Sequence, residues 1–168
     1  MHNVHKRIGV ISDTHGLLRE EALEVLRGVD HIIHAGDIGK PRVVDVLREI
    51  APITIVKGNV DKGEWAQKYL DIEAIEILGH AIYVLHNLDE LDIDPAGLFS
   101  VVISGHSHIP KSETRGGVLY FNPGSIGPRR FHLPIAMGIL SISKERVSGE
   151  ILQLETGTGA TKNARGAK

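Results

Sequence analysis

The chain has 168 residues, a formal net charge of −2, 42% hydrophobic residues and 24% charged residues. These values are typical of a globular domain, and they exclude a strongly basic surface for nucleic acid. The chain contains no cysteine, which excludes disulfides and thiolate metal sites. Residues 1–7 are too polar for a signal peptide and no apolar run is long enough to span a bilayer. We therefore expect a cytoplasmic protein without a membrane partner.

The first part of the chain alternates short apolar runs with amphipathic segments. The apolar runs at 8–12, 31–36 and 53–56 predict strands, because they are rich in Val and Ile. Apolar residues at helical spacing predict a helix over 17–29 and a second one from Pro41 to just before Pro52. This order implies parallel strands joined by helical crossovers.

The second part of the chain predicts hairpins. Strands are expected at 74–78 and 81–85, joined by Gly79-His80, and at 111–114 and 118–121 around Gly116-Gly117. A short helix capped by Asp94-Pro95 precedes a strand at 101–104, and a last antiparallel pair covers 135–143 and 147–154. We expect one domain over residues 1–155 and a disordered tail over residues 156–168, which has no large apolar residue.

Polar side chains that bind metals follow five of the predicted strands: Asp13 and His15, Asp37, Asn59, His86, and His106 and His108. In an extended segment, Asp13 and His15 would point the same way. For these two residues alone, an equally good interpretation is that Asp13 caps the next helix and that His15 lies on the surface. Five strands that end in this way favour a ligand site at the carboxyl edge of a sheet. Two carboxylates, one amide and four imidazoles are enough for two divalent ions, and Asp37 is the candidate for a bridging carboxylate.

The motifs Asp13-x-His15, Gly36-Asp37, Gly58-Asn59, His86 and Gly105-His106-x-His108 resemble the signature of the calcineurin-like metallophosphoesterases. The resemblance covers residues 8–154 and is greatest to the small phosphodiesterases of the YfcE and MJ0936 group, including the loop Asn122-Pro123-Gly124-Ser125. It implies an α/β fold, a four-layer α-β-β-α sandwich of two mixed sheets. It also implies that Asp13, His15 and His108 hold one metal, that Asn59, His86 and His106 hold the other, and that Asp37 bridges them.

The resemblance further implies a phosphodiesterase in which a hydroxide bridging two divalent metals attacks phosphorus in line, with catalytic roles for Asp37, Asn59 and His86. Nitrogen and oxygen ligands allow Mn, Ni, Fe, Co or Zn, of which Mn is favoured. The expected partner is a small phosphodiester, with phosphate contacts from Asn59, Arg129 and Arg130. A solvated surface pair is an equally good interpretation of the two arginines. Homo-oligomerisation stays open, as does the choice among cyclic nucleotides, nucleic-acid fragments and glycerophosphodiesters.

Two residues depart from the family pattern. Val60 stands where relatives have His or Cys, so it cannot protonate a leaving group, and Asn87 follows His86 where relatives usually have Gly. Asn tolerates left-handed backbone angles, so we expect that turn to survive. We expect structural roles for Asp61, for a buried and hydrogen-bonded His34 and for Ser12 in a tight turn. Two alternative functions remain, a phosphomonoesterase or nucleotide phosphatase, which Val60 disfavours, and a non-catalytic interaction module like the retromer subunit of the same superfamily.

Overall fold

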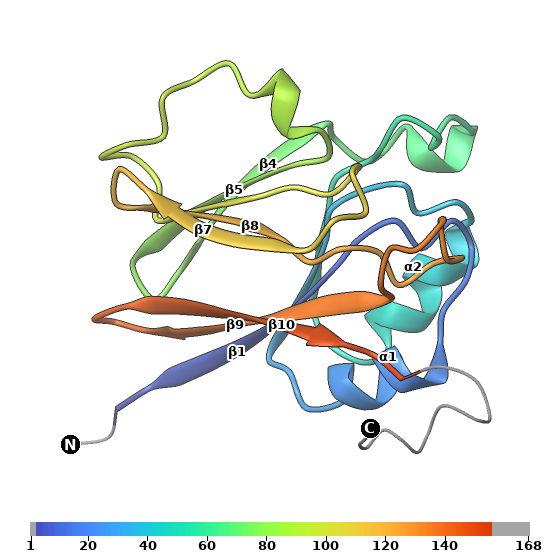
Figure 1. Cartoon of the computed structure of the whole chain (residues 1–168), viewed down its shortest axis with the longest axis horizontal. Coiled ribbons are helices and arrows are strands. Elements are labelled where there is room, and N and C mark those ends of the chain that lie inside the picture. Colours follow the sequence, from blue (N-terminus) through green and yellow to red (C-terminus); the bar gives the residue numbers. More distant parts are fainter. Residues whose placement is uncertain (1–2, 156–168) are drawn as a thin grey trace.

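The computed structural model describes residues 3–155, which form two five-stranded mixed β-sheets packed face to face (Figure 1). The tail at 156–168, which we expect to be disordered, lies outside the described residues. The two mixed sheets confirm the predicted fold class.

The first sheet has the strand order β10-β9-β1-β2-β3. Its first three strands along the chain pair in parallel, as the β-α-β-α-β pattern predicts, and β9 and β10 add an antiparallel edge. The strand bounds are β1 His5–Ile11, β2 His31–His34, β3 Ile53–Ile55, β9 Ala136–Ser143 and β10 Val147–Gln153.

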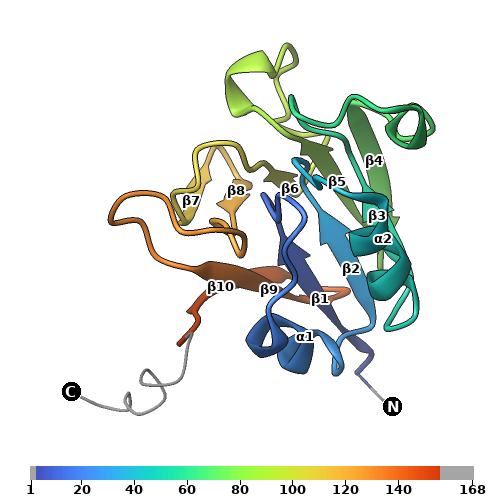
Figure 2. The ribbon, with the colours of Figure 1, turned by 90° about the vertical axis from the view of Figure 1, so that its right-hand side faces the viewer.

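Two helices cover the outer face of this sheet, α1 (Glu20–Leu26) and α2 (Pro41–Arg48) (Figure 2). The predicted helix over 17–29 is therefore too long. Arg19 has an extended backbone, and its guanidinium donates hydrogen bonds to the carbonyls of Ile126 and Gly127, both at 2.9 Å. These contacts with a distant loop hold the segment before α1 out of the helix.

The second sheet has the order β4-β5-β6-β8-β7, with β4 Ile72–Ile77, β5 His80–Leu85, β6 Val101–Ile103, β7 Lys111–Arg115 and β8 Val118–Asn122. The predicted hairpin between β4 and β5 is present, but its turn is Leu78-Gly79 rather than Gly79-His80. Both turn residues have positive φ, 50° and 86°, which matches the twist of a tight hairpin. His80 is consequently a strand residue.

The outer layer over the second sheet is thin. The segment between β5 and β6 lies on the side away from the first sheet (Figure 1) and contains only one short 3₁₀ helix, η2 (Leu88–Glu90). Leu88 and Phe99 from this segment pack against Tyr83 and Val102 of the sheet. The helix predicted after Asp94 is wrong, because the Asp94 carboxylate accepts the Ala96 N–H at 3.0 Å and caps a single turn.

Apolar side chains fill the space between the two sheets, among them Val10, Ile33, Val84, Ile103 and Phe121. This packing fixes the two sheets against each other and brings the loops that follow β1, β2, β3, β5 and β6 together. A second short helix, η1 (Glu64–Ala66), follows the loop after β3. Among residues 3–155, no helix is long and apolar enough to cross a membrane.

Candidate metal centre

The loops after the central strands are joined by backbone hydrogen bonds. The Asp13 N–H donates to the Gly36 carbonyl, and the Gly105 N–H donates to the His86 carbonyl, both at 2.9 Å. These two bonds tie β1 to β2 in the first sheet and β5 to β6 in the second. The predicted ligands therefore stand on a rigid platform made by both sheets.

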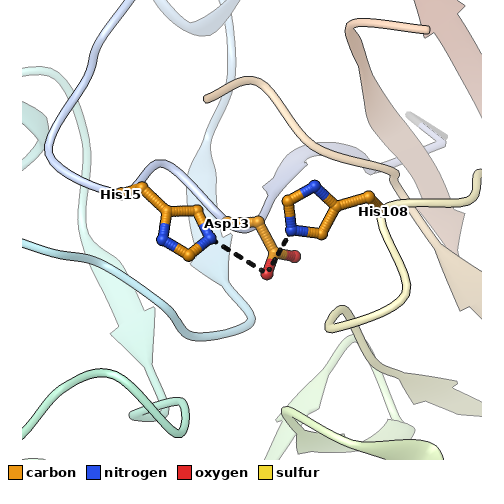
Figure 3. A group of neighbouring side chains, drawn as sticks. All are labelled: Asp13, His15 and His108. Atoms are coloured by element: carbon orange, nitrogen blue, oxygen red, sulfur yellow. Dashed lines mark ion pairs between the residues drawn. The ribbon is translucent and has the colours of Figure 1, made fainter. Parts of the chain in front are cut away.

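A first group of ligands surrounds the carboxylate of Asp13 (Figure 3). Its Oδ1 lies 3.3 Å from Nε2 of His108 and 3.9 Å from Nε2 of His15. Asp13 and His108 are buried, whereas His15 is partly exposed. His106, on the loop that also carries His108, lies 93 residues after Asp13 in the chain, so the site depends on the complete fold.

A second group surrounds the carboxylate of Asp37. Its Oδ2 lies 3.4 Å from Nε2 of His86 and 3.6 Å from Nε2 of His15, while His86 is also 3.9 Å from Asp13 Oδ1. The ligand atoms of Asp13, Asp37 and His86 all lie within 4.8 Å of one another. Both carboxylates thus face imidazoles of both groups, and the bridging role of Asp37 stays a prediction.

Asn59 and His106 complete the set of seven. Nδ1 of His106 lies 3.2 Å from Oδ1 of Asn59, and the His106 ring stands edge-on to His86 with 5.1 Å between ring centroids. The His106 N–H also donates to Asp13 Oδ2 at 3.1 Å. All seven residues predicted to bind metal are therefore gathered in one place.

Several polar atoms in this cluster have no hydrogen-bond partner among the described residues. They are Asp13 Oδ1, His15 Nε2, His86 Nε2 and His108 Nδ1. A buried polar atom without a partner costs about 1–3 kcal/mol, and native proteins contain few of them. Three of these four atoms face one another across the cluster, so a divalent cation held by carboxylate oxygens and imidazole nitrogens would satisfy them together. The residues fit a metal centre.

The two shifted pKa values of the cluster act in opposite directions on cation binding, because Asp37 stays ionised while a proton on His86 competes with a metal. Burial alone would raise the pKa of Asp37, but the neighbouring His86 imidazole, whose Nε2 lies 3.4 Å from Oδ2, and the hydrogen bond from the Val60 N–H lower the pKa to about 2. Burial opposes charge on His86, yet Asp37, Asp13 and the Ala35 carbonyl raise its pKa overall. The His86 Nδ1 donates to the Ala35 carbonyl at 2.7 Å, which leaves Nε2 turned toward the carboxylates as a ligand atom.

The backbone of the ligand loops is strained. Five ligand residues have positive φ, a conformation that non-glycine residues seldom adopt. They are Asp13 (58°), His15 (47°), Asp37 (57°), His106 (72°) and His108 (64°). The extended geometry expected for residues 13–15 is therefore wrong: sharp left-handed turns, rather than strand alternation, aim these side chains. Strain concentrated in this way is characteristic of functional sites.

Two glycines make room for the carboxylates. A Cβ atom on Gly58 would collide with Oδ1 and the backbone nitrogen of Asp37, and one on Gly105 would collide with the Ser12 hydroxyl. Neither glycine has a positive φ. Close approach between neighbouring loops, rather than backbone conformation, requires glycine at these positions.

Asp61 has the predicted structural role, and its contacts are more extensive than those of a turn cap. Its buried carboxylate accepts hydrogen bonds from the N–H groups of Ile38 (3.0 Å), Gly39 (3.0 Å) and Gly58 (2.8 Å). It thereby fixes the Asp37 loop against the Asn59 loop. The sequence offered one signal for this role, an acidic residue two positions after a ligand.

The loop at 122–127 also supports the cluster. Asn122 Nδ2 donates to the Gly105 carbonyl at 3.0 Å, and the Ser125 hydroxyl donates to the Asp13 carbonyl at 3.0 Å. Ser12, which we expected only to fit a turn, donates to Asp13 Oδ2 at 2.7 Å. These roles could not be predicted from the sequence, because hydroxyl and amide groups in tight turns are common and carry no specific signal.

The remaining predictions have mixed outcomes. His34 is buried and hydrogen-bonded as expected, with Nε2 3.0 Å from the Thr14 hydroxyl. Asn87 has a φ of −113°, so the turn after His86 needs no left-handed residue. Arg129 and Arg130 are exposed, and the Arg129 guanidinium donates to the Leu133 carbonyl at 3.1 Å. Among the described contacts, neither arginine touches the seven ligands.

Comparison with known proteins identifies the family. A family model described as the calcineurin-like phosphoesterase superfamily domain matches residues 7–145. A "probable metallophosphoesterase" of Methanothermobacter thermautotrophicus is 32% identical over 158 residues, covering 87% of this chain and 91% of that protein. Phosphodiesterase MJ0936 of Methanocaldococcus jannaschii is 28% identical over 166 residues, covering 88% of this chain and 99% of that protein.

Solved structures show the same fold. Vps29 of Chaetomium thermophilum superposes with a TM-score of 0.78 at 18% identity, covering 94% of each chain, which is a likeness of fold alone. The region matched by the family model, residues 7–145, includes all seven predicted ligand residues. The chain belongs to the calcineurin-like phosphoesterase superfamily.

Proposed function

We propose that this chain is a metal-dependent phosphodiesterase. The observation that carries the proposal is the buried Asp13 carboxylate, whose Oδ1 has no hydrogen-bond partner but lies between the imidazoles of His108, His15 and His86. Relatives named phosphodiesterases support this reaction class. A relative named a probable metallophosphoesterase supports metal dependence, and the carboxylate and imidazole groups gathered here agree with it.

The proposed centre holds two divalent ions. Asp13, His15 and His108 would hold one, Asn59, His86 and His106 the other, and Asp37 would bridge them, with Mn²⁺ as the favoured ion. When bound, such ions supply positive charge for the phosphate oxygens and lower the pKa of water, which provides a nucleophile at neutral pH.

The chain itself prepares the substrate site. Asn59, His86 and His106 line a pocket of about 270 Å³ beside the carboxylates, and Lys57 adds a cation to its wall. Lys57 is held by Asp71, with 3.8 Å between Nζ and Oδ1. We propose that the Asn59 amide contacts a phosphate oxygen. The ionised Asp37, which His86 orients, would belong to the metal centre. This pocket, rather than the Arg129 and Arg130 loop, is the proposed phosphate site.

Val60 sets the substrate preference in this proposal. Its side chain is 44% exposed beside Asn59 and has no proton to give to a departing alcohol. Without a general acid, the rate falls by about 10²–10⁴ for poor leaving groups. Esters with good leaving groups should therefore be preferred, which argues against an efficient general phosphomonoesterase.

The test compares hydrolysis of bis-(p-nitrophenyl) phosphate and p-nitrophenyl phosphate in the presence of Mn²⁺. The diester should be turned over faster, and Asp37→Asn should reduce its turnover by at least about 10²-fold. Asp45→Asn, which changes an exposed carboxylate on α2, is the matched control and should have no effect. Equal or faster monoester turnover would contradict the preference for diesters, and no turnover of either ester with metal bound would contradict the proposal. Both esters release p-nitrophenolate, so the role of Val60 is tested separately, with esters of poor leaving groups.

A further inference from the structure

A second cavity adjoins the proposed phosphate site. It has a volume of about 320 Å³ and is lined by residues of β7 and β8 and by residues 87–89 of the outer layer over the second sheet. It shares two lining residues, Asn87 and His106, with the pocket beside the carboxylates. A phosphodiester bound at the metal centre could therefore extend one of its two substituents past His106 into this cavity.

A cation–π pair contributes to the lining of the cavity. The Arg115 guanidinium lies 4.0 Å from the centroid of the Tyr120 ring, and both residues line the cavity. Leu88 and Ile109 form apolar walls, and the Ile109 side chain is 52% exposed although it is large and hydrophobic. A guanidinium over an aromatic ring has a second face that is available for stacking with a planar group, and the Arg115 side chain is 52% exposed.

The charges of the cavity favour a planar uncharged group over a second anion. Lys111 Nζ lies 3.1 Å from Glu113 Oε1, and Arg115 Nε lies 3.9 Å from Glu113 Oε2. One carboxylate thus neutralises part of the charge of both cations, and Asp89 adds a negative charge to the lining. The Asp89 carboxylate is also placed to accept a hydrogen bond from a hydroxyl or amino group.

We propose that this cavity binds the nucleoside part of a nucleotide-type phosphodiester, with the base stacked on Arg115 between Leu88 and Ile109. The volume is near the lower end of ligand pockets, about 300–1,000 Å³, so it suits one ring system and its sugar rather than a lipid chain or a peptide. This inference rests on the proposed function for the position of the phosphate. It adds a substrate class and three specificity residues that are not metal ligands.

The experiment uses two diesters with the same leaving group, thymidine 5′-(p-nitrophenyl phosphate) and ethyl p-nitrophenyl phosphate. The thymidine ester should have the lower KM, by at least about 5-fold, since stacking of one base contributes a factor of about 5 to 150 in affinity. Arg115→Gln and Ile109→Ser should each raise the KM for the thymidine ester and leave the ethyl ester unchanged. Arg146→Gln, on the turn between β9 and β10, is the matched control and should change neither.

Binding of thymidine 5′-monophosphate, followed by calorimetry for the same variants, separates this inference from the proposed function. Loss of affinity in Arg115→Gln but not in Arg146→Gln supports the nucleoside site even if neither diester is hydrolysed. Equal KM values for the two diesters, or an equal change of both in Arg115→Gln, would overturn it. Failure of thymidine 5′-monophosphate to bind the wild-type protein more tightly than ethyl phosphate would also overturn it.

Discussion

The hydroxyl of Ser12 donates a 2.7 Å hydrogen bond to Oδ2 of Asp13 and leaves Oδ1 as the oxygen that faces the imidazoles. The neighbouring residue thus selects which carboxylate oxygen is offered to a metal. The His106 N–H, at 3.1 Å from the same Oδ2, strengthens this selection. A ligand held in this way needs no reorientation when the ion arrives.

We therefore expect Ser12→Ala to weaken metal binding by about 10- to 100-fold, the usual effect of losing a group that orients a ligand. The free energy of unfolding of the metal-free protein should fall by only about 1 kcal/mol. Calorimetric titration with Mn²⁺ measures the first quantity and urea unfolding the second. Ser141→Ala, at an exposed position of β9, is the control, and equal metal affinity in the two variants would show that Ser12 has no orienting role.

The second prediction concerns Gly58 and Gly79, where alanine is disfavoured for different reasons, a steric collision at Gly58 and the backbone conformation at Gly79. Gly58→Ala would keep acceptable backbone angles but has no space for a Cβ beside Asp37, whereas Gly79→Ala meets nothing within 4 Å but has a φ of +86°. Gly58→Ala should therefore abolish Mn²⁺ binding. Gly79→Ala should cost about 1–2 kcal/mol in stability and leave binding intact. Metal titration and urea unfolding of both variants test this, and tight Mn²⁺ binding by Gly58→Ala would refute it.

The third prediction is a dependence of stability on pH that comes from His34. Burial lowers the pKa of His34 from 6.5 to about 4, and its Nδ1 accepts the Gly36 N–H, which leaves that nitrogen no room for a proton. As the pH falls below 6.5, the unfolded chain binds this proton and the folded chain does not. Stability is therefore full above about pH 6.5 and decreases toward pH 4, by about 3 kcal/mol for this group.

Urea unfolding of the metal-free protein at pH 7.5 and pH 5 measures this effect. His34→Gln removes the titrating group, so the wild-type protein should lose more stability than the variant between the two pH values. His132→Gln, in the exposed loop after β8, is the control and should follow the wild type. The same loss in the wild type and in His34→Gln would assign the pH dependence to other residues.

The fourth prediction restores a proton donor at Val60. Its side chain is largely exposed beside Asn59, so Val60→His should be tolerated by the fold. Turnover of monoesters and of esters with poor leaving groups should rise by about 10²-fold, and the pH–rate profile should gain an alkaline limb. Val60→Gln is similar in size without a titrating group and should stay at the wild-type rate. A rise in both variants would mean that polarity alone, rather than proton donation, limits the reaction.

The positions of the ligands could be predicted because they follow apolar runs. Residues 8–11 of β1 are buried and Ile53–Ile55 form the half-buried β3, and a polar residue after each such strand is expected at the carboxyl edge of the sheet. The family resemblance then predicts that the ligands of both sheets meet at one shared edge. The ligand positions themselves could be predicted because they are local features of the sequence.

What could not be predicted depends on contacts between distant segments. The start of α1 is set by bonds from Arg19 to a loop more than 100 residues away. The left-handed backbone of Asp13 and His108 is imposed by the surrounding loops and is not a preference of these residues. The three N–H groups that bind Asp61 come from two loops, and only the folded chain brings them to one carboxylate. Periodicity carries none of this information.

The wide separation of Asp13 and His108 along the chain has a consequence for biosynthesis. A nascent chain that has emerged only as far as β3 carries Asp13, His15 and Asp37 but not the histidines of the second sheet, which lie at 86 and beyond. The complete set of seven proposed ligands exists only after the second sheet has docked. In the proposed metal centre, the finished geometry of both sheets would therefore decide which cation is held, and not the partial ligand set of the emerging chain.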